Sequence, residues 1–301
     1  MSALPPFRSY LYVPGSNPHM IEKALASEAD ALILDLEDAV TPHRKAEARA
    51  YVARLLQSPQ AKPLLVRVNA LNTELALPDI AAVATPTLTA LCLPKIETPR
   101  DVCVVAEQLE RHACPAGIHC LLESALAIEH AFAIASAHPR VIGLGLGEVD
   151  LATNLAISDD DAFSYARSRV IVAARAARLP SPVQSIYANI RDIDGLRTST
   201  WRGKRTGFFG RTAIHPAQIP IINEIFTPTP DEVAHAQKLL ETFAHAAQQG
   251  KGALVLDDGS FIDQATIESA HRTLALHNQQ RITSSHLRDS FFPHGESQAT
   301  V

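Results

Sequence analysis

Short apolar segments alternate with amphipathic or alanine-rich stretches along most of this 301-residue chain. The apolar segments are rich in leucine, valine and isoleucine and are bounded by turn-forming residues, which is typical of buried strands. The stretches between them have helical spacing, so the pattern predicts strands and helices in alternation, with parallel strand pairing. The predicted strands are residues 10–13, 31–36, 64–68, 88–93, 117–122, 141–146, 183–190 and 208–214.

Start signals mark several of the helices between these strands. Asn17 is a candidate N-cap followed by Pro18 at the first helical position, and Thr98-Pro99 opens another helix in the same way. Eight strands with intervening helices favour a (β/α)₈ TIM barrel, and the alternative is an open doubly wound sheet. The predicted helices are residues 21–27, 41–56, 98–111, 125–135, 159–178, 192–200 and 217–226.

The alternation stops at Thr227-Pro228-Thr229-Pro230. A helix over 231–249, a short β-like run at 253–256 and a last helix over 263–276 follow it. A closed barrel does not need this segment, so we expect a C-terminal helical extension that packs on the barrel or is exchanged with a neighbouring subunit. The predicted organisation is a barrel over residues 1–226, an extension or lid over 227–283 and a polar, mobile tail over 284–301.

Two carboxylates follow neighbouring predicted strands. Glu123 comes directly after the strand 117–122, and Asp150 comes shortly after the strand 141–146. The carboxyl ends of parallel strands meet at one end of a barrel, where active sites are built, so we expect both side chains in one cavity. Mg²⁺ takes one or two protein carboxylates and completes its octahedron with water and substrate oxygens. Solvated loop carboxylates are the equally weighted alternative at this point.

Other polar residues collect at the same predicted end. Arg67 closes an apolar strand and has the planar fork that holds a carboxylate or carbonyl oxygen. Asp35, Glu37 and Asp38 follow the second strand, where they are expected to orient Arg67 or hold metal-bound water. Lys23, on the first helix, is an ordinary solvated lysine unless it anchors an anionic phosphate or carboxylate.

Composition narrows the classes of function. The net charge of −5 gives no basic field for nucleic acid or an anionic membrane, and no apolar run reaches membrane-spanning length. The four cysteines form no C-x-x-C pair, and the N-terminus does not read as a signal peptide, which favours a cytoplasmic protein. The run Gly143-Leu-Gly-Leu-Gly147 lacks the third glycine of a dinucleotide fingerprint, so its glycines are expected to let backbone approach a ligand.

A set of motifs in order resembles the citrate lyase β-subunit-like CoA-ester lyases of the aldolase/citrate lyase superfamily, which include malyl-CoA and citramalyl-CoA lyases. The match runs from about Arg8 to Leu276. The motifs are Arg8-Ser-Tyr-Leu-Tyr-Val-Pro-Gly15, Leu34-Asp-Leu-Glu-Asp-Ala-Val40, Arg67-Val-Asn69, Leu93-Pro-Lys95, Glu123-Ser-Ala125, Gly147-Glu-Val-Asp-Leu151 and Ala213-Ile-His-Pro216.

The resemblance implies a Mg²⁺-dependent barrel enzyme, with Mn²⁺ as the alternative ion, that cleaves a short β-hydroxyacyl-CoA to acetyl-CoA and pyruvate or glyoxylate. Citramalyl-CoA is the first choice of substrate and malyl-CoA the second. It also implies a homo-oligomer, a trimer or a dimer of trimers. The implied roles are metal binding for Glu123 and Asp150, catalysis for Arg67 and Asp263, substrate binding for Tyr12, Lys23, Arg67 and Glu123, and CoA binding for Ile214 and His215.

Several alternatives stay open. One alternative is a citryl-ACP lyase β subunit of a citrate lyase complex. Another is a malate or citramalate synthase or thioesterase. A third, from a different class, is a non-catalytic barrel that binds an acyl-CoA or a keto acid. It also departs from the family pattern in three places. Relatives often carry Glu-Asp where this chain has Val149-Asp150, an Asp-x-Pro where it has Asp263-Gln264-Ala265, and lysine at the position of His19.

Overall fold

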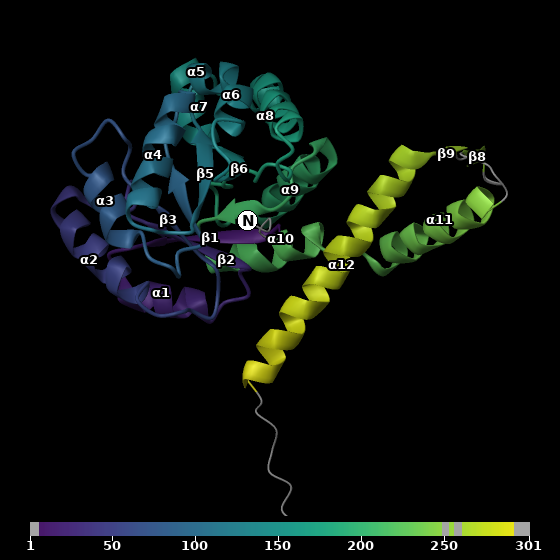
Figure 1. Cartoon of the computed structure of the whole chain (residues 1–301), viewed down its shortest axis with the longest axis horizontal. Coiled ribbons are helices and arrows are strands. Elements are labelled where there is room, and N and C mark those ends of the chain that lie inside the picture. Colours follow the sequence, from purple (N-terminus) through teal and green to yellow (C-terminus); the bar gives the residue numbers. More distant parts are fainter. Residues whose placement is uncertain (1–5, 249–252, 256–260, 292–301) are drawn as a thin grey trace, which may run out of the picture. The chain divides into compact units, whose positions relative to one another are not determined.

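The structure, a computed structural model, describes residues 6–248, 253–255 and 261–291. Within those residues seven parallel strands form one sheet with the order β6-β5-β4-β3-β2-β1-β7 (Figure 1). The fold is therefore of the α/β class, as the alternating pattern predicted. The strands are β1 (Ser9–Pro14), β2 (Ala31–Asp35), β3 (Leu64–Arg67), β4 (Ala90–Leu93), β5 (Gly117–Leu122), β6 (Val141–Leu146) and β7 (Arg211–Ala213).

The predicted strand over 183–190 is largely absent. Only two parallel bridges remain there, Gly145 to Val183 and Gln184 to Arg211. They connect the edge strands β6 and β7 through a single short segment of chain. Beyond Gln184 the segment leaves the sheet: the Ser185 carbonyl accepts a hydrogen bond from Arg211 Nε at 2.9 Å, and the Ser185 hydroxyl accepts one from the Glu148 amide at 3.2 Å.

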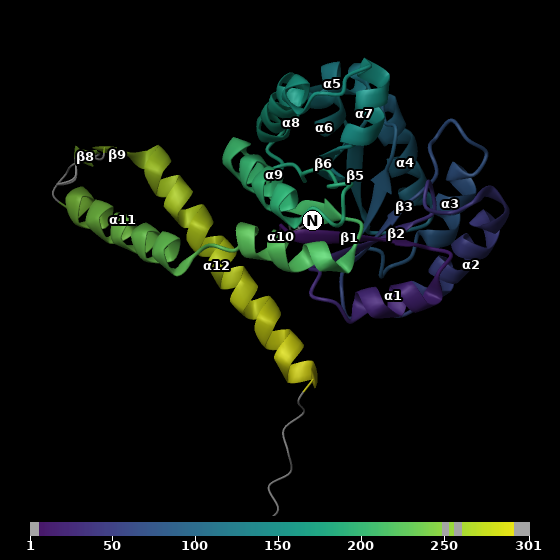
Figure 2. The same cartoon turned by 180° about the vertical axis from the view of Figure 1, so that it is seen from behind.

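Helices lie around the outside of the sheet in both views (Figures 1 and 2). The structure adds α3, which the sequence pattern did not predict, and extends α9 to Thr206. The helices are α1 (Pro18–Leu25), α2 (Lys45–Leu55), α3 (Ala76–Val83), α4 (Pro99–Arg111), α5 (Ala125–Glu129), α6 (Ala131–Ala135), α7 (Glu148–Leu155), α8 (Ser164–Ala176), α9 (Ile193–Thr206) and α10 (Ile219–Phe226), with 3₁₀ turns η1 (Pro42–Arg44), η2 (Asp160–Phe163) and η3 (Pro216–Gln218).

The predicted helix starts at Asn17 and Thr98 are confirmed. The Asn17 side chain accepts a hydrogen bond from the Met20 amide at 3.2 Å. Thr98 and Asp101 form a reciprocal capping box, in which each side chain accepts a hydrogen bond from the other residue's amide. These caps satisfy amides that the first helical turn leaves without partners, so they fix where the chain turns from strand exit to helix.

The sheet separates two apolar layers. In β2, Leu32 and Leu34 belong to the larger core between sheet and helices, whereas Ala31 and Ile33 belong to a smaller cluster on the opposite face. This alternation follows from the two-residue period of a strand. The smaller cluster is the interior face of the sheet, and it carries the site described below.

The chain divides into two compact units, Met1–Phe226 and Thr227–Val301. The second contains α11 (Pro230–Gln248), an antiparallel pair of short strands, β8 (Leu254–Val255) and β9 (Phe261–Ile262), and α12 (Gln264–Phe291). Its own apolar cluster includes Leu239, Ile262 and Ile267. Helix α12 runs further than predicted and includes 284–291 of the segment expected to be a mobile tail; 292–301 lies outside the described residues. None of the helices in the described parts of the chain has the length and apolar character needed to span a bilayer.

Candidate active site

A cavity of about 370 Å³ opens at the carboxyl ends of the strands, on the interior face of the sheet. Asp35 ends β2, Arg67 ends β3 and Glu123 directly follows β5, so the strand ends bring these side chains together as predicted. The cavity is lined by Tyr10, Tyr12, Ile33, Asp35, Asp38, Ala39, Arg67, His119, Leu121, Glu123, Gly145, Leu146, Gly147, Glu148, Val149, Asp150, Val183, Gln184, Ser185, Ile186, Thr212 and Ile214.

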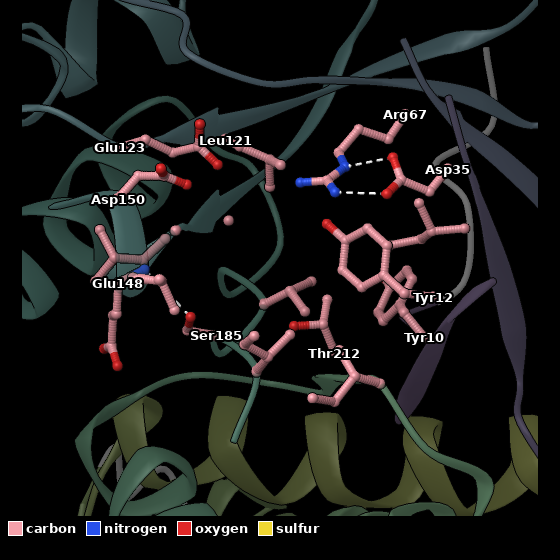
Figure 3. A pocket seen from close by; sticks show the side chains of 18 of the residues that line it. Tyr10, Tyr12, Asp35, Arg67, Leu121, Glu123, Glu148, Asp150, Ser185 and Thr212 are labelled. Carbon is pink, nitrogen blue, oxygen red and sulfur yellow. Dashed lines mark hydrogen bonds and ion pairs between the residues drawn. The ribbon is translucent and has the colours of Figure 1, made fainter. Parts of the chain in front are cut away.

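Glu123 and Asp150 lie beside each other on one wall of this cavity, and their carboxylates point toward one another (Figure 3). Glu123 is only 5% exposed, and its Oε2 accepts a hydrogen bond from the Lys95 amide at 2.9 Å. Asp150 comes from the first turn of α7, so this carboxylate lies on a helix and not at a strand exit. A Cβ at Gly147 would lie 2.5 Å from the Glu123 Oε1, so a glycine is needed here for Glu123 to pack against the end of β6.

The glycines of Gly143-Leu-Gly-Leu-Gly147 have a packing role that the sequence did not reveal. A Cβ at Gly143 or Gly145 would meet the His119 ring at 2.9 or 3.0 Å. The glycines make room for side chains of and after the neighbouring strand β5. Gly145 and Gly147 also line the cavity beside Asp150, so a contact of their backbone with a ligand stays a prediction.

Acidic groups outnumber basic ones around Glu123. Burial, followed by the charges of Glu37 and Asp150, raises the pKa of Glu123 to about 8. The protein's own cations nearby, Arg67 and Lys95, are already paired with other carboxylates. A carboxylate pair with one buried member, Glu123, lacks a counter-charge of its own, which a divalent cation with oxygen preference would supply. The described residues contain no group of three or more His, Cys, Asp or Glu side chains placed to hold a metal, so the fit is to an ion that needs only two protein carboxylates.

Arg67 faces this pair from the opposite wall (Figure 3). Its Nε and Nη2 donate to the two carboxylate oxygens of Asp35 at 2.7 and 2.6 Å, and its Nη1 lies 3.0 Å from Glu37 and 3.6 Å from Asp38. Asp35 itself is fixed by the amides of residues 37 and 39, both at 2.9 Å. The guanidinium also lies 5.0 Å from the centre of the Tyr12 ring. Arg67 is thus held in one orientation by a two-point contact.

Lys95 connects the two walls, a role that its place at a strand exit did not reveal. Its backbone is left-handed, with φ of 53°, which is strained for a residue with a Cβ and turns its amide to Glu123. Its Nζ lies 3.0 Å from a Glu37 oxygen. Both carboxylate oxygens of Glu37 are buried and lie near Arg67 and Lys95, but neither makes a hydrogen bond of good geometry. Burial raises the pKa of this carboxyl, and the charges of Arg67 and Lys95 oppose that rise.

A buried network that the sequence did not indicate supports the acidic loop 36–38. Lys45 on α2 donates to the carbonyls of Leu36 and Glu37, both at 2.9 Å, and to Asn69. Asp79 on α3 is fully buried and accepts from the Asn69 amide and side chain and from Arg49 at 2.6 Å. The helix that holds Asp79 was not predicted, so no sequence signal placed it near Arg67.

Three of the predicted contacts, Lys23, His215 and Asp263, do not line this cavity. Lys23 is exposed on α1, and neither it nor His215 lines the cavity, although Ile214 does. The His215 side chain caps η3 by accepting from the Ala217 amide. Asp263 lies in the second unit, where its Oδ1 accepts from the Thr266 amide and hydroxyl, both at 3.0 Å, at the start of α12.

Comparison with known proteins agrees with the motifs. Over 275 residues the chain is 37% identical to a (3S)-malyl-CoA thioesterase of Cereibacter sphaeroides, covering 90% of this chain and 94% of that protein. It is 33% identical to the citrate lyase subunit beta of Escherichia coli K12, covering 89% and 92%. A crystal structure of CitE from Mycobacterium tuberculosis in complex with magnesium, acetoacetate and coenzyme A superimposes with a TM-score of 0.75 at 28% identity, covering 92% of this chain and 99% of that one.

RipC from Yersinia pestis is similar over a smaller part of the chain, with a TM-score of 0.66, 29% identity and coverage of 75% and 97%. The family model described as HpcH/HpaI aldolase/citrate lyase matches residues 8–216, which include every strand of the sheet and all the residues of the cavity. The resemblance inferred from the motifs is confirmed: this chain belongs to the HpcH/HpaI aldolase/citrate lyase family of enzymes.

Proposed function

We propose that the protein is a Mg²⁺-dependent carbon–carbon lyase on a closed (β/α)₈ barrel. Its substrate would be a short β-hydroxyacyl-CoA, citramalyl-CoA or malyl-CoA, and its products acetyl-CoA and pyruvate or glyoxylate. The observation that carries this proposal is the arrangement of Glu123 and Asp150 across one cavity from an immobilised Arg67. Related proteins with magnesium and coenzyme A in their crystal structures support the same choice of ion and carrier.

Glu123 and Asp150 would hold the ion, which when bound supplies Lewis-acid polarisation of the hydroxyl and carboxylate oxygens of the substrate. The protein contributes orientation on this wall. The Lys95 amide fixes one Glu123 oxygen, and the absence of a side chain at Gly147 lets the carboxylate lie against β6. Metal binding would also favour the charged form of Glu123, in opposition to the burial that disfavours it.

Arg67 would stabilise the negative charge that develops on the thioester oxygen. Cleavage removes the hydroxyl proton and breaks the bond between the carbinol carbon and the carbon next to the thioester, and the electron pair moves into the enolate. A guanidinium held by two bonds to Asp35 needs no reorientation when this charge appears, which is the condition for strong electrostatic stabilisation. Tyr12, whose ring lies against Arg67, would contact the same part of the substrate.

A proton must then reach the enolate carbon. The family resemblance assigns this step to Asp263, delivered from the C-terminal unit of a neighbouring subunit in a trimer or a dimer of trimers. Ile214 and His215 would contact the CoA moiety, and Lys23 its anionic groups. The catalytic role of Asp263 in this proposal rests on the resemblance alone.

The test is release of a keto acid from a panel of β-hydroxyacyl-CoA esters, with Mg²⁺ or with EDTA. We expect Mg²⁺-dependent release that Glu123→Ala and Asp150→Ala abolish and that Asp194→Ala, an exposed acid on α9, leaves unchanged. Absence of keto acid from every ester, or equal rates for Glu123→Ala and the parent protein, would show that this site is not a lyase centre.

Thioester hydrolysis is the second candidate, because relatives at 36–37% identity are named (3S)-malyl-CoA thioesterase. Hydrolysis would give free CoA and a hydroxy acid in place of acetyl-CoA and a keto acid. The similarity to citrate lyase β subunits favours a third reading, an ACP-linked subunit of a larger complex. Cleavage of free CoA esters by the purified chain alone would argue against that reading.

A further inference from the structure

Two alternate positions of β6, Gly143 and Gly145, and the residue that follows the strand, Gly147, carry no side chain on the interior face. The adjacent strand β5 fills only part of the space with His119, Leu121 and Glu123, which occupy the matching interior positions. The space that remains joins the cavity at the strand ends. The glycine run therefore opens the interior of the sheet below the pair Glu123 and Asp150.

We call this deeper part of the cavity the inner chamber and define it by Tyr10, Ile33, His119, Leu121, Gly145 and Val183. None of these six residues is an acid, lysine or arginine, whereas the charged side chains of the cavity lie at the strand ends. Four strand positions separate His119 from Glu123, which corresponds to roughly 13 Å along β5. The inner chamber thus lies well below the charged wall, within the same cavity of about 370 Å³.

His119 forms the floor of this chamber. Its side chain is more than nine-tenths buried, at 6% exposure, and its ring lies 6.3 Å from that of Tyr10. No hydrogen bond to it occurs among the described residues, and burial lowers its pKa to about 4, so the imidazole is neutral at pH 7. A second, smaller cavity of about 40 Å³ lies beyond it and shares Tyr10, His119 and Val183 with the first. His119 is therefore part of a partition between two spaces.

We propose that the inner chamber binds an uncharged aliphatic substituent on the carbinol carbon of the substrate, and that His119 sets the length of substituent accepted. This inference rests on the proposed lyase function and deepens it. The charged ends of the substrate bind at the strand ends, and the neutral chamber accepts methylene groups. The substrate class would then extend beyond citramalyl-CoA to β-hydroxyacyl thioesters that yield unbranched 2-oxo acids longer than pyruvate.

The magnitude follows from burial of apolar surface. Each methylene group transferred from water into the chamber tightens binding roughly fourfold until the chain reaches the floor, after which affinity falls. Replacement of His119 by alanine removes the imidazole and should connect the chamber with the smaller cavity, which His119 also lines. That change should move the longest accepted chain by at least one carbon.

The experiment is calorimetric titration of the full-length protein, at saturating Mg²⁺, with unbranched 2-oxo acids from glyoxylate to 2-oxoheptanoate. We expect affinity to rise roughly fourfold per carbon beyond pyruvate and then to fall. His119→Ala should move the fall to a longer acid, whereas His119→Leu, which keeps the bulk and removes the nitrogens, should leave it in place. Cys120→Ala is the matched control, since it shortens a buried side chain of the same strand that faces the other layer.

Two results would overturn the inference: an affinity that does not depend on chain length, or the same limit in His119→Ala as in the parent protein. Carbon–carbon cleavage is assayed on the same samples to separate the two proposals. If the protein cleaves an ester but its affinity for 2-oxo acids does not depend on chain length, the inference about the chamber is wrong and the lyase function stands. If affinity depends on chain length but no ester is cleaved, the lyase function is wrong and the chamber still binds aliphatic chains.

Discussion

Replacement of Glu123 by glutamine should stabilise the metal-free protein. The pKa of this carboxyl is about 8 in the folded chain and 4.5 when unperturbed. A raised folded pKa means that the favourable contribution is complete below pH 4.5 and is lost as the pH rises toward 8. From pH 4.5 to pH 7 the free energy of unfolding should therefore lose about 3 kcal/mol through this carboxyl, at 1.36 kcal/mol per pH unit. Glutamine does not ionise, so it avoids this loss, and its side-chain carbonyl can accept the hydrogen bond from the Lys95 amide.

The assay is urea unfolding of the parent protein and Glu123→Gln between pH 4 and 8, in EDTA and in Mg²⁺. In EDTA the variant should exceed the parent by about 3 kcal/mol at pH 7 and by less than about 1 kcal/mol at pH 5. Mg²⁺ should stabilise the parent and not the variant, because the ion binds the folded state through the carboxylate that the variant lacks. A variant less stable than the parent at pH 7 in EDTA, or equal stabilisation of both by Mg²⁺, would refute this reasoning.

Two other substitutions test the wall of Arg67 and its support. Arg67→Lys keeps the charge but cannot make two parallel bonds to Asp35, so kcat/KM should fall about 10²- to 10³-fold; a loss under threefold would show that orientation is unimportant. Asp79→Asn leaves the charge of Arg49 facing a neutral group in a buried network. The free energy of unfolding measured in urea should therefore fall by roughly 3 kcal/mol. An unchanged urea midpoint would mean that this pair contributes nothing to stability.

The sequence pattern was most informative where one rule decides the outcome. Strand positions followed from runs of apolar residues, and helix starts followed from capping residues such as Thr98. Glu123 and Arg67 could be placed at one end of the sheet because parallel strands share a direction. The family could be inferred from seven short motifs in their order along the chain.

Features that depend on contacts between distant segments could not be predicted. The predicted strand over 183–190 keeps only two bridges, and from Ser185 onward its polar groups bond to Arg211 and the Glu148 amide, which are distant in the sequence. The glycine run of β6 also makes room for His119 of the neighbouring strand and for Glu123 just after it, a packing role that the run itself does not signal. Lys95 contributes through an amide turned by a left-handed backbone, a property that its side chain does not signal.

The fate of the carbon skeleton tests the central claim most directly. Citramalyl-CoA and malyl-CoA labelled with ¹³C at the carbinol carbon would be followed by NMR in the presence of the protein and Mg²⁺. We predict that the carbinol signal is replaced by the keto-carbon signal of pyruvate, or by the aldehyde-hydrate signal of glyoxylate, as acetyl-CoA appears, and that EDTA stops the change. Retention of the carbinol signal while free CoA accumulates would contradict the lyase account and identify the protein as a thioesterase.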